Sequence, residues 1–175
     1  MQELPHAKLR VSTEEVPFRW MTGTQSHEGI AGTKAAIDHI AWIGREVSGN
    51  EGLGRREALR VAYSAIEEHE RELCLRMIHG LMEIDGLKIW GITNPERILE
   101  RAPTVSFTHP KMIASEIGSI LAERGIFAWA GNFYALELTE ALGLEPEGVL
   151  RVGLLHYNSM EEVNFFLETL RGILG

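Results

Sequence analysis

The feature that most constrains this chain is a long helical pattern near its middle. Between about residues 55 and 84, one stripe of positions recurs at intervals of three or four, which is the spacing of a single helix face. The residues on this stripe are Leu59, Ala62, Ile66, His69, Leu73, Met77 and Leu81. Because such a helix is long for a small domain, the pattern predicts a connector between two parts of the molecule.

The segment before this helix has little regular structure at first. Residues 1–30 are expected to be extended chain and loop, and a first helix is expected from about Gly32 to Val47, where Ala36, Ile40 and Ile43 share its face. A linker rich in glycine follows at 49–54.

After Asp85 and Gly86 the pattern changes to short strands alternating with helices. The expected order is β-β-α-β-α-β-α, and Ser159 with Glu162 has the spacing of a capping box at the start of the last helix. The sequence therefore predicts an α+β fold, divided into residues 1–54, a connecting helix at 55–85 and a small domain at 86–175.

Charge and composition exclude several classes of function. The chain has 175 residues, with 17 Lys plus Arg against 25 Asp plus Glu, and its net charge of −8 disfavours binding to nucleic acid. No apolar run reaches the roughly 20 residues that cross a bilayer, and the start lacks the pattern of a signal peptide. A single cysteine, Cys74, fits a reducing compartment, so a cytoplasmic protein without membrane contact is expected.

The seven histidines do not form a known metal-binding motif. His69 and His79 are interpreted as packing or helix-end residues, and Cys74 as a small buried apolar residue rather than a nucleophile. No metal site is predicted.

Two segments suggest chemistry. The loop at 22–32, TGTQSHEGIAG, leads into a helix with hydroxyl groups and glycines, which suits either a phosphate or an ordinary capped helix start. In the segment LRVGLLHYN at 150–158, Arg151 interrupts an apolar strand. Its guanidinium requires an anionic partner, which is either a bound carboxylate or phosphate, or a structural Asp or Glu.

These segments together resemble the C-terminal part of a fold-type-I, pyridoxal-phosphate-dependent enzyme of the cysteine desulfurase-like group in aminotransferase class V. The matching stretches are WMTGTQSHEGIAGTKAAIDHIAWIG, APTVSFT, ERGIFAWAGNFYA and LRVGLLHYNSMEEVNFFLETL. The resemblance covers nearly the whole chain. It implies that residues 86–175 are the small C-terminal domain of an α/β parent enzyme and that residues 1–54 are the remnant of its large domain.

The resemblance also assigns roles to individual residues. Gly23 and Thr24 match a loop that reaches the cofactor phosphate of the neighbouring subunit, with Gln25 and His27 nearby, and this implies a homodimer. Arg151 matches the arginine that binds the α-carboxylate of a small amino-acid substrate. Asn158, in the turn after this strand, is interpreted as a structural cap.

Two departures from the family pattern limit what this chain can do alone. Where the desulfurases carry a sulfur-accepting cysteine in a Gly-His-His-Cys-Ala context, this chain has Gly-Asn-Phe-Tyr-Ala, so Asn132 and Tyr134 are expected only to line the active site. The four lysines, Lys8, Lys34, Lys88 and Lys111, lack the context of the family's Schiff-base lysine.

The leading hypothesis is therefore a truncated or split family member, inactive alone, which pairs with itself or with a chain that supplies the missing large domain. The alternative is a non-catalytic interaction or dimerisation module that binds a paralogue or another chain. A third reading is a free-standing domain that binds a small amino acid through Arg151.

Overall fold

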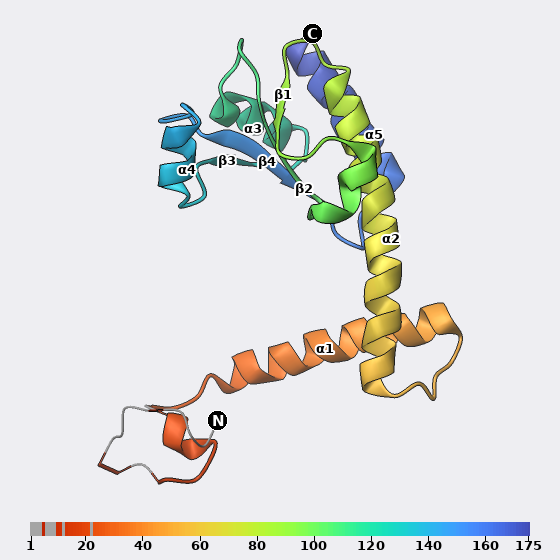
Figure 1. The fold of residues 1–175 in the computed structure, drawn as a ribbon, viewed down its shortest axis with the longest axis vertical. Coiled ribbons are helices and arrows are strands. Elements are labelled where there is room, and N and C mark those ends of the chain that lie inside the picture. Colours follow the sequence, from red (N-terminus) through yellow and green to blue (C-terminus); the bar gives the residue numbers. More distant parts are fainter. Residues whose placement is uncertain (1–4, 6–9, 12, 22) are drawn as a thin grey trace. The chain divides into compact units, whose positions relative to one another are not determined.

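The structure is a computed structural model that describes residues 5, 10–11, 13–21 and 23–175 (Figure 1). Its contacts group the chain into two compact units, Met1–Ala62 and Tyr63–Gly175, and the boundary falls inside one helix. Each unit is described by itself below.

The first unit contains a short 3-10 helix, η1 (Phe18–Trp20), and the long helix α1 (His27–Ser48). Helix α1 begins five residues before the expected start at Gly32, because Ser26 acts as its N-cap and accepts a hydrogen bond from the Gly29 N–H. It ends at Gly49, whose left-handed backbone (φ 64°) closes the last turn.

Helix α1 does not bury the apolar stripe expected from its sequence. Its two buried residues are Ala41 and Gly44, and the first turns of α2 (Arg55–Met82) contribute Ala58 and Ala62, both fully buried. The two helices approach so closely that a Cβ at Gly44 would lie 1.8 Å from the Ala58 carbonyl oxygen. Small residues at the crossing point, rather than the large apolar ones, therefore join α1 to α2.

The second unit begins within α2 and continues through a small sheet with helices. The elements that follow α2 are β1 (Lys88–Trp90), η2 (Pro95–Glu100), β2 (Thr104–Thr108), α3 (Ala114–Glu123), β3 (Trp129–Gly131), α4 (Leu136–Ala141), β4 (Val149–Gly153) and α5 (Met160–Leu174). This order matches the expected β-β-α-β-α-β-α, with the 3-10 helix η2 as an addition. The α+β fold class is thus confirmed.

The sheet has four strands in the order β1-β2-β4-β3, and every neighbouring pair is antiparallel. One face is apolar: Ile89, Phe107, Leu150 and Ala130 form a row across all four strands. Because side chains alternate along a strand, the residues next to these in sequence lie on the opposite face.

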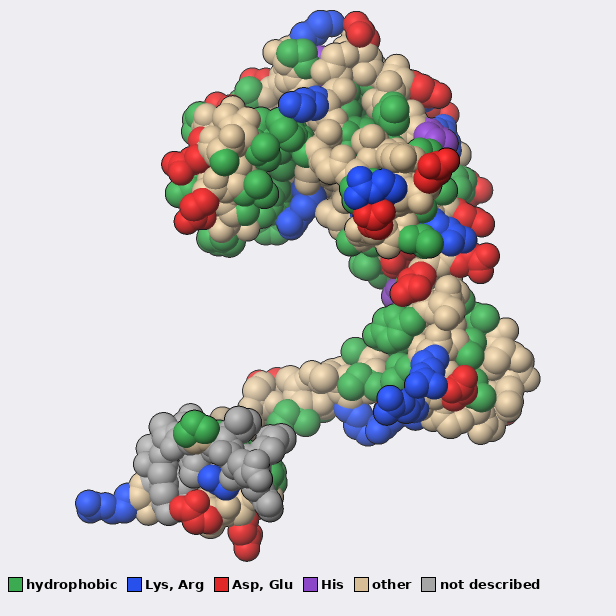
Figure 2. All heavy atoms as spheres, viewed as in Figure 1, with side chains coloured by type: hydrophobic (Ala, Val, Ile, Leu, Met, Phe, Trp, Pro, Cys, Tyr) green, Lys and Arg blue, Asp and Glu red, His purple; other side chains and the backbone are tan. Residues whose placement is uncertain are grey.

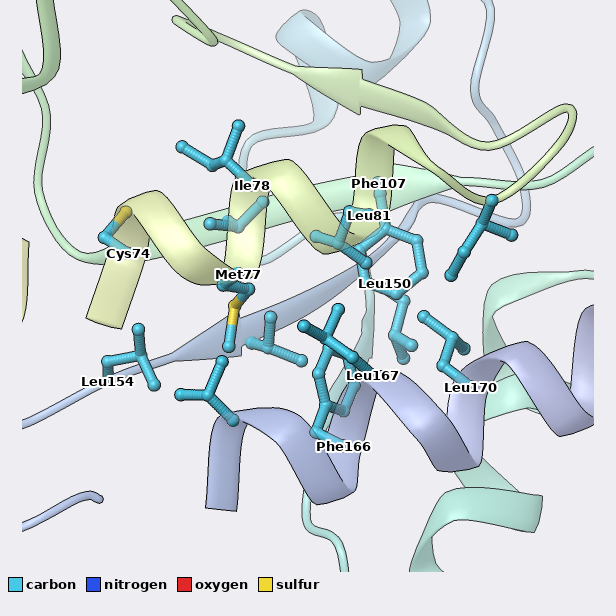
Figure 3. Close-up of a cluster of buried hydrophobic side chains, with 14 of the residues drawn as sticks. Cys74, Met77, Ile78, Leu81, Phe107, Leu150, Leu154, Phe166, Leu167 and Leu170 are labelled. Atoms are coloured by element: carbon cyan, nitrogen blue, oxygen red, sulfur yellow. The ribbon is translucent and has the colours of Figure 1, made fainter. Parts of the chain in front are cut away.

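Helices α2, α3 and α5 supply the side chains that cover the apolar face. Figure 3 shows Met77, Ile78 and Leu81 of α2 gathered with Leu167 and Leu170 of α5 beside residues of the sheet. The stripe expected on the long helix is therefore confirmed as core from Leu73 onward, where Leu73, Met77 and Leu81 are all buried.

Among the residues that the structure describes, no helix is long and apolar enough to cross a membrane, and no group of three or more His, Cys, Asp or Glu residues could hold a metal ion.

We predict that Gly44→Ala destabilises the first unit. The added methyl group must displace the Ala58 backbone, and overpacking of this kind costs about 1–3 kcal/mol. Gly32→Ala in the same helix is the matched control, since a Cβ there meets nothing within 4 Å and helix propensity favours alanine by about 1 kcal/mol. Urea unfolding followed by far-ultraviolet circular dichroism measures both changes. Equal stability of the two variants would contradict the close crossing.

We further predict an acid-sensitive start of α5. The Glu162 carboxylate accepts hydrogen bonds from the Ser159 N–H (2.7 Å) and from the Asn158 amide (3.3 Å), which hold its pKa below its usual range. A lowered pKa means that the ionised form stabilises the fold, so this contribution is complete above about pH 4.3 and disappears as the pH falls through the lower folded value.

The measurement is the free energy of unfolding as a function of pH below about 5. Glu162→Gln should flatten this dependence, whereas Glu161→Gln, outside the capping box, should leave it unchanged. The same slope in Glu162→Gln and in the unaltered chain would contradict the prediction.

Candidate functional site

The face of the sheet opposite the core carries a row of polar and aromatic residues. Trp90, Ser106, Arg151 and Trp129 occupy directly paired positions on β1, β2, β4 and β3. This row follows from the core itself, since Leu150 and Val152 turn inward and Arg151 between them must point outward.

Arg151 has an exposed side chain at the edge of an open depression. The depression is lined by Thr104, Phe127, Ala128, Trp129, Arg151, Gly153, Leu154 and Leu155. Within the part of the chain that the structure describes, no carboxylate forms an ion pair with Arg151 and no group accepts a hydrogen bond from it. The structural Asp or Glu that the sequence left open as a partner is therefore absent from these residues.

The neighbour that the structure does give to Arg151 is aromatic. The guanidinium carbon lies 3.7 Å from the centre of the Phe133 ring, close enough for a cation–π interaction. Phe133 belongs to the tight turn between β3 and α4, and it has a positive φ of 57°.

The same turn holds Asn132 and Tyr134. The Asn132 side-chain oxygen accepts a hydrogen bond from the Tyr134 N–H at 3.1 Å, which is ordinary turn chemistry. The Tyr134 side chain is fully exposed. Phe133, which stands between these two residues in the sequence, is the member of the turn that contacts Arg151.

The other expected site residues lie in the first unit. Gly23 and Thr24 are exposed, Gln25 is partly buried, and His27 is the first residue of α1. The Thr24 hydroxyl makes no hydrogen bond with any described residue, so it is available to a ligand. Gln25 also lines a shallow depression over the first turns of α1.

The first turn of α1 is already satisfied by its own side chains. Ser26 accepts from the Gly29 N–H and donates to the Glu28 carboxylate at 3.0 Å. The Glu28 carboxylate is also hydrogen-bonded to its own backbone N–H, and with Ser26 this holds its pKa below the usual range. A negative charge therefore occupies the end of the helix that would attract a phosphate. This leaves Thr24 as the group best suited to contact one.

The residues present do not fit a complete site for pyridoxal phosphate. The Lys34 ammonium group forms an ion pair with Asp38 at 2.5 Å, and the Lys88 ammonium group lies 3.7 Å from the centre of the Trp90 ring. No lysine among the described residues lines the depression at Arg151, and Lys8 lies outside them. Neither the Thr24 hydroxyl nor the Arg151 guanidinium makes a hydrogen bond with a described residue.

Other residues with reactive side chains have structural roles. Cys74 is buried in the core, and burial raises the pKa of its thiol, so it is not an activated nucleophile. His69 pairs with the Asn158 carbonyl oxygen through Nε2 at 2.8 Å. The Asn158 side chain accepts from the Leu155 N–H at 2.9 Å, in agreement with its expected capping role.

The sequence patterns assigned no role to three aromatic residues, namely Phe133, Trp129 and Trp90. Trp129 and Trp90 become visible only through strand register, which places them in one row with Arg151. Phe133 could have been noticed in the sequence as an aromatic residue that lies in a turn and belongs to no apolar helix or strand pattern.

Comparisons with known proteins agree on one family. The sequence model for aminotransferase class-V proteins matches residues 52–166. The aminotransferase-like protein FGM3 of Gibberella zeae is 36% identical over 116 residues, which are 64% of this chain and 28% of that protein. A probable cysteine desulfurase of Mycobacterium leprae is 29% identical over 148 residues, which are 85% of this chain and 30% of that protein.

A solved structure gives the same result. The apo cysteine desulfurase from Thermococcus onnurineus superposes with a TM-score of 0.71 at 27% identity and covers 90% of this chain and 34% of that one. The chain thus spans about a third of the length of the relatives that it matches. With a family model over most of its length and a fold shared with a solved relative, the chain belongs to the aminotransferase class-V family.

Proposed function

We propose that this chain provides the substrate-carboxylate site of a pyridoxal-phosphate-dependent enzyme that acts on a small amino acid. The observation that carries the proposal is the exposed guanidinium of Arg151, which has no acidic partner among the described residues. Membership of the aminotransferase class-V family supports both the cofactor and the class of substrate.

Arg151 is suited to this task by its chemistry. A guanidinium presents a planar fork of N–H donors that binds a carboxylate with two parallel hydrogen bonds. The depression beside it has mainly apolar walls, so few protein groups compete with a bound carboxylate for the guanidinium donors.

The first unit would contribute to the active site of a neighbouring subunit. We propose that Gly23 and Thr24 contact the cofactor phosphate of a neighbouring subunit in a dimer, with Gln25 and His27 beside them. The free Thr24 hydroxyl supports this role. In this proposal residues 1–54 act as part of the large domain, 55–85 as the connecting helix and 86–175 as the small domain, all in the cytoplasm.

Sulfur transfer to a cysteine of this chain is not part of the proposal. Tyr134 stands where the desulfurases carry the acceptor, and a phenol cannot form a persulfide. The only cysteine, Cys74, is 2% exposed and its thiol pKa is raised by burial. The relatives named as cysteine desulfurases therefore support the family chemistry but not this last step.

A second candidate is an interaction or dimerisation module without catalysis. It is favoured by the large apolar side chains that α1 leaves exposed, namely Ile30, Ile37, Trp42 and Val47. Figure 2 shows hydrophobic side chains at the surface of this helix. An interaction module has no need of a carboxylate site at Arg151, and this separates the two functions.

We predict that the 175-residue chain alone does not retain pyridoxal phosphate covalently. After incubation with the cofactor and reduction with borohydride, intact mass and peptide mapping should show no stoichiometric adduct on a single lysine. The reason is that Lys34 is engaged by Asp38 and that no described lysine adjoins the Arg151 depression. A full adduct on one lysine would overturn this part of the proposal.

We predict that Arg151→Ala abolishes carboxylate binding. The probe is N-acetyl-L-alanine, titrated into the 15N-labelled chain while the Arg151 side-chain resonance and the β4 amides are followed by NMR. N-acetyl-L-alaninamide, which lacks the carboxylate, is the ligand control. Arg151→Lys should bind at least about tenfold more weakly, because it loses the paired donors of the guanidinium. Unchanged binding by Arg151→Ala would exclude Arg151 as the carboxylate site.

A further inference from the structure

The structure assigns to Phe133 the role of positioning the guanidinium of Arg151 for carboxylate binding. Its ring lies against the guanidinium and accepts no hydrogen bond from it, so that the N–H donors are left for a ligand in the depression. This inference rests on the proposed function of Arg151 and adds a residue to it.

The contact between the two side chains is direct. The guanidinium carbon lies 3.7 Å from the centre of the Phe133 ring, well inside the roughly 6 Å limit for cation–π attraction. The ring supplies no hydrogen-bond acceptor in competition with a ligand, so every N–H of Arg151 stays available while the charge is stabilised. On the sheet itself, Trp129 occupies the position paired with Arg151.

The backbone is held in an unfavourable conformation to make this contact. Phe133 and Tyr134 have φ values of 57° and 61°, and they are the only described residues other than glycine with positive φ. Each such residue is disfavoured by its side chain, and the conformation persists only where the surroundings impose it. Two in succession indicate a turn selected for where it places a side chain.

The neighbouring glycines impose the path of this turn. A Cβ at Gly148 would lie 2.3 Å from the backbone of Gly131, so the start of β4 passes directly against the end of β3. Both glycines have positive φ, as this approach requires. The turn that begins after Gly131 therefore folds back toward β4, where Arg151 lies two residues into the strand.

This arrangement prepares Arg151 before a ligand arrives. An exposed arginine samples many rotamers and loses that freedom when it binds a carboxylate. With Phe133 against it, part of the freedom is already lost in the free protein. Phe133 should therefore strengthen carboxylate binding without touching the carboxylate.

The test uses the complete 175-residue chain and the same probe, N-acetyl-L-alanine, with its amide as the ligand control. Phe133→Leu keeps an apolar side chain but removes the aromatic ring, and Phe133→Trp keeps a ring. Phe165→Leu is the matched control, because Phe165 is a half-exposed phenylalanine on α5 outside the Arg151 depression. Phe133→Gly removes the ring while relieving the positive φ, so loss of binding in that variant cannot be attributed to misfolding.

We expect Phe133→Leu and Phe133→Gly to bind the probe about threefold more weakly than the unaltered chain, because the arginine side chain then loses more rotamer freedom on binding. Phe133→Trp and Phe165→Leu should bind as the unaltered chain does. The Arg151 side-chain NMR signal should also lose its ring-current shift in the leucine and glycine variants, which checks that the contact exists in solution. Rescue of binding by Phe133→Trp but not by Phe133→Leu separates positioning by a ring from simple apolar packing.

Two results separate this inference from the proposed function. If the unaltered chain binds the probe and Arg151→Ala does not, but Phe133→Leu binds with unchanged affinity, the role of Phe133 is overturned and the carboxylate site stands. If the unaltered chain shows no carboxylate-dependent shift, the proposed site fails, and the role of Phe133 fails with it.

Discussion

The packing of the apolar sheet face against α2, α3 and α5 determines which way the side chains of the strands point in the second unit. That core buries Phe107, Leu150 and Val152. The ring centres of Phe107 and of Phe166 on α5 lie 6.5 Å apart. Because the strands alternate, burial of Leu150 and Val152 directs Arg151 to the opposite face. The burial of apolar area, which is the dominant stabilising term in folding, thus also fixes the position of an exposed cation.

The parts of this fold that follow from periodicity could be read from the sequence. The element order after Gly86, the strand Thr104–Thr108 and the capping box at Ser159 all match the expectation. The start of α1 did not, because Ser26, six residues before the expected start at Gly32, supplies the cap. The α1 stripe also failed to predict burial, because Gly44 and Ala58 pack backbone against backbone and hydrophobicity does not report such contacts.

The candidate site was predictable only in part, for a related reason. Arg151 could be recognised as a cation in an apolar strand, but its neighbours come from other strands and from a turn. Strand register and the positive φ values at Phe133 and Tyr134 arise from tertiary contacts, such as that between Gly131 and Gly148. The cofactor and the amino-acid substrate were predicted from the resemblance to a family. The comparisons show that family and its fold.

The burial of Cys74 gives the molecule a built-in reporter. It is the sole thiol of the chain, it is 2% exposed, and its neighbours in the core include residues of α2. Burial slows the reaction of Cys74 with a thiol reagent, so the labelling rate rises when that core opens transiently. The unmodified sequence therefore allows the dynamics of one unit to be timed without a fluorescent tag or an engineered residue.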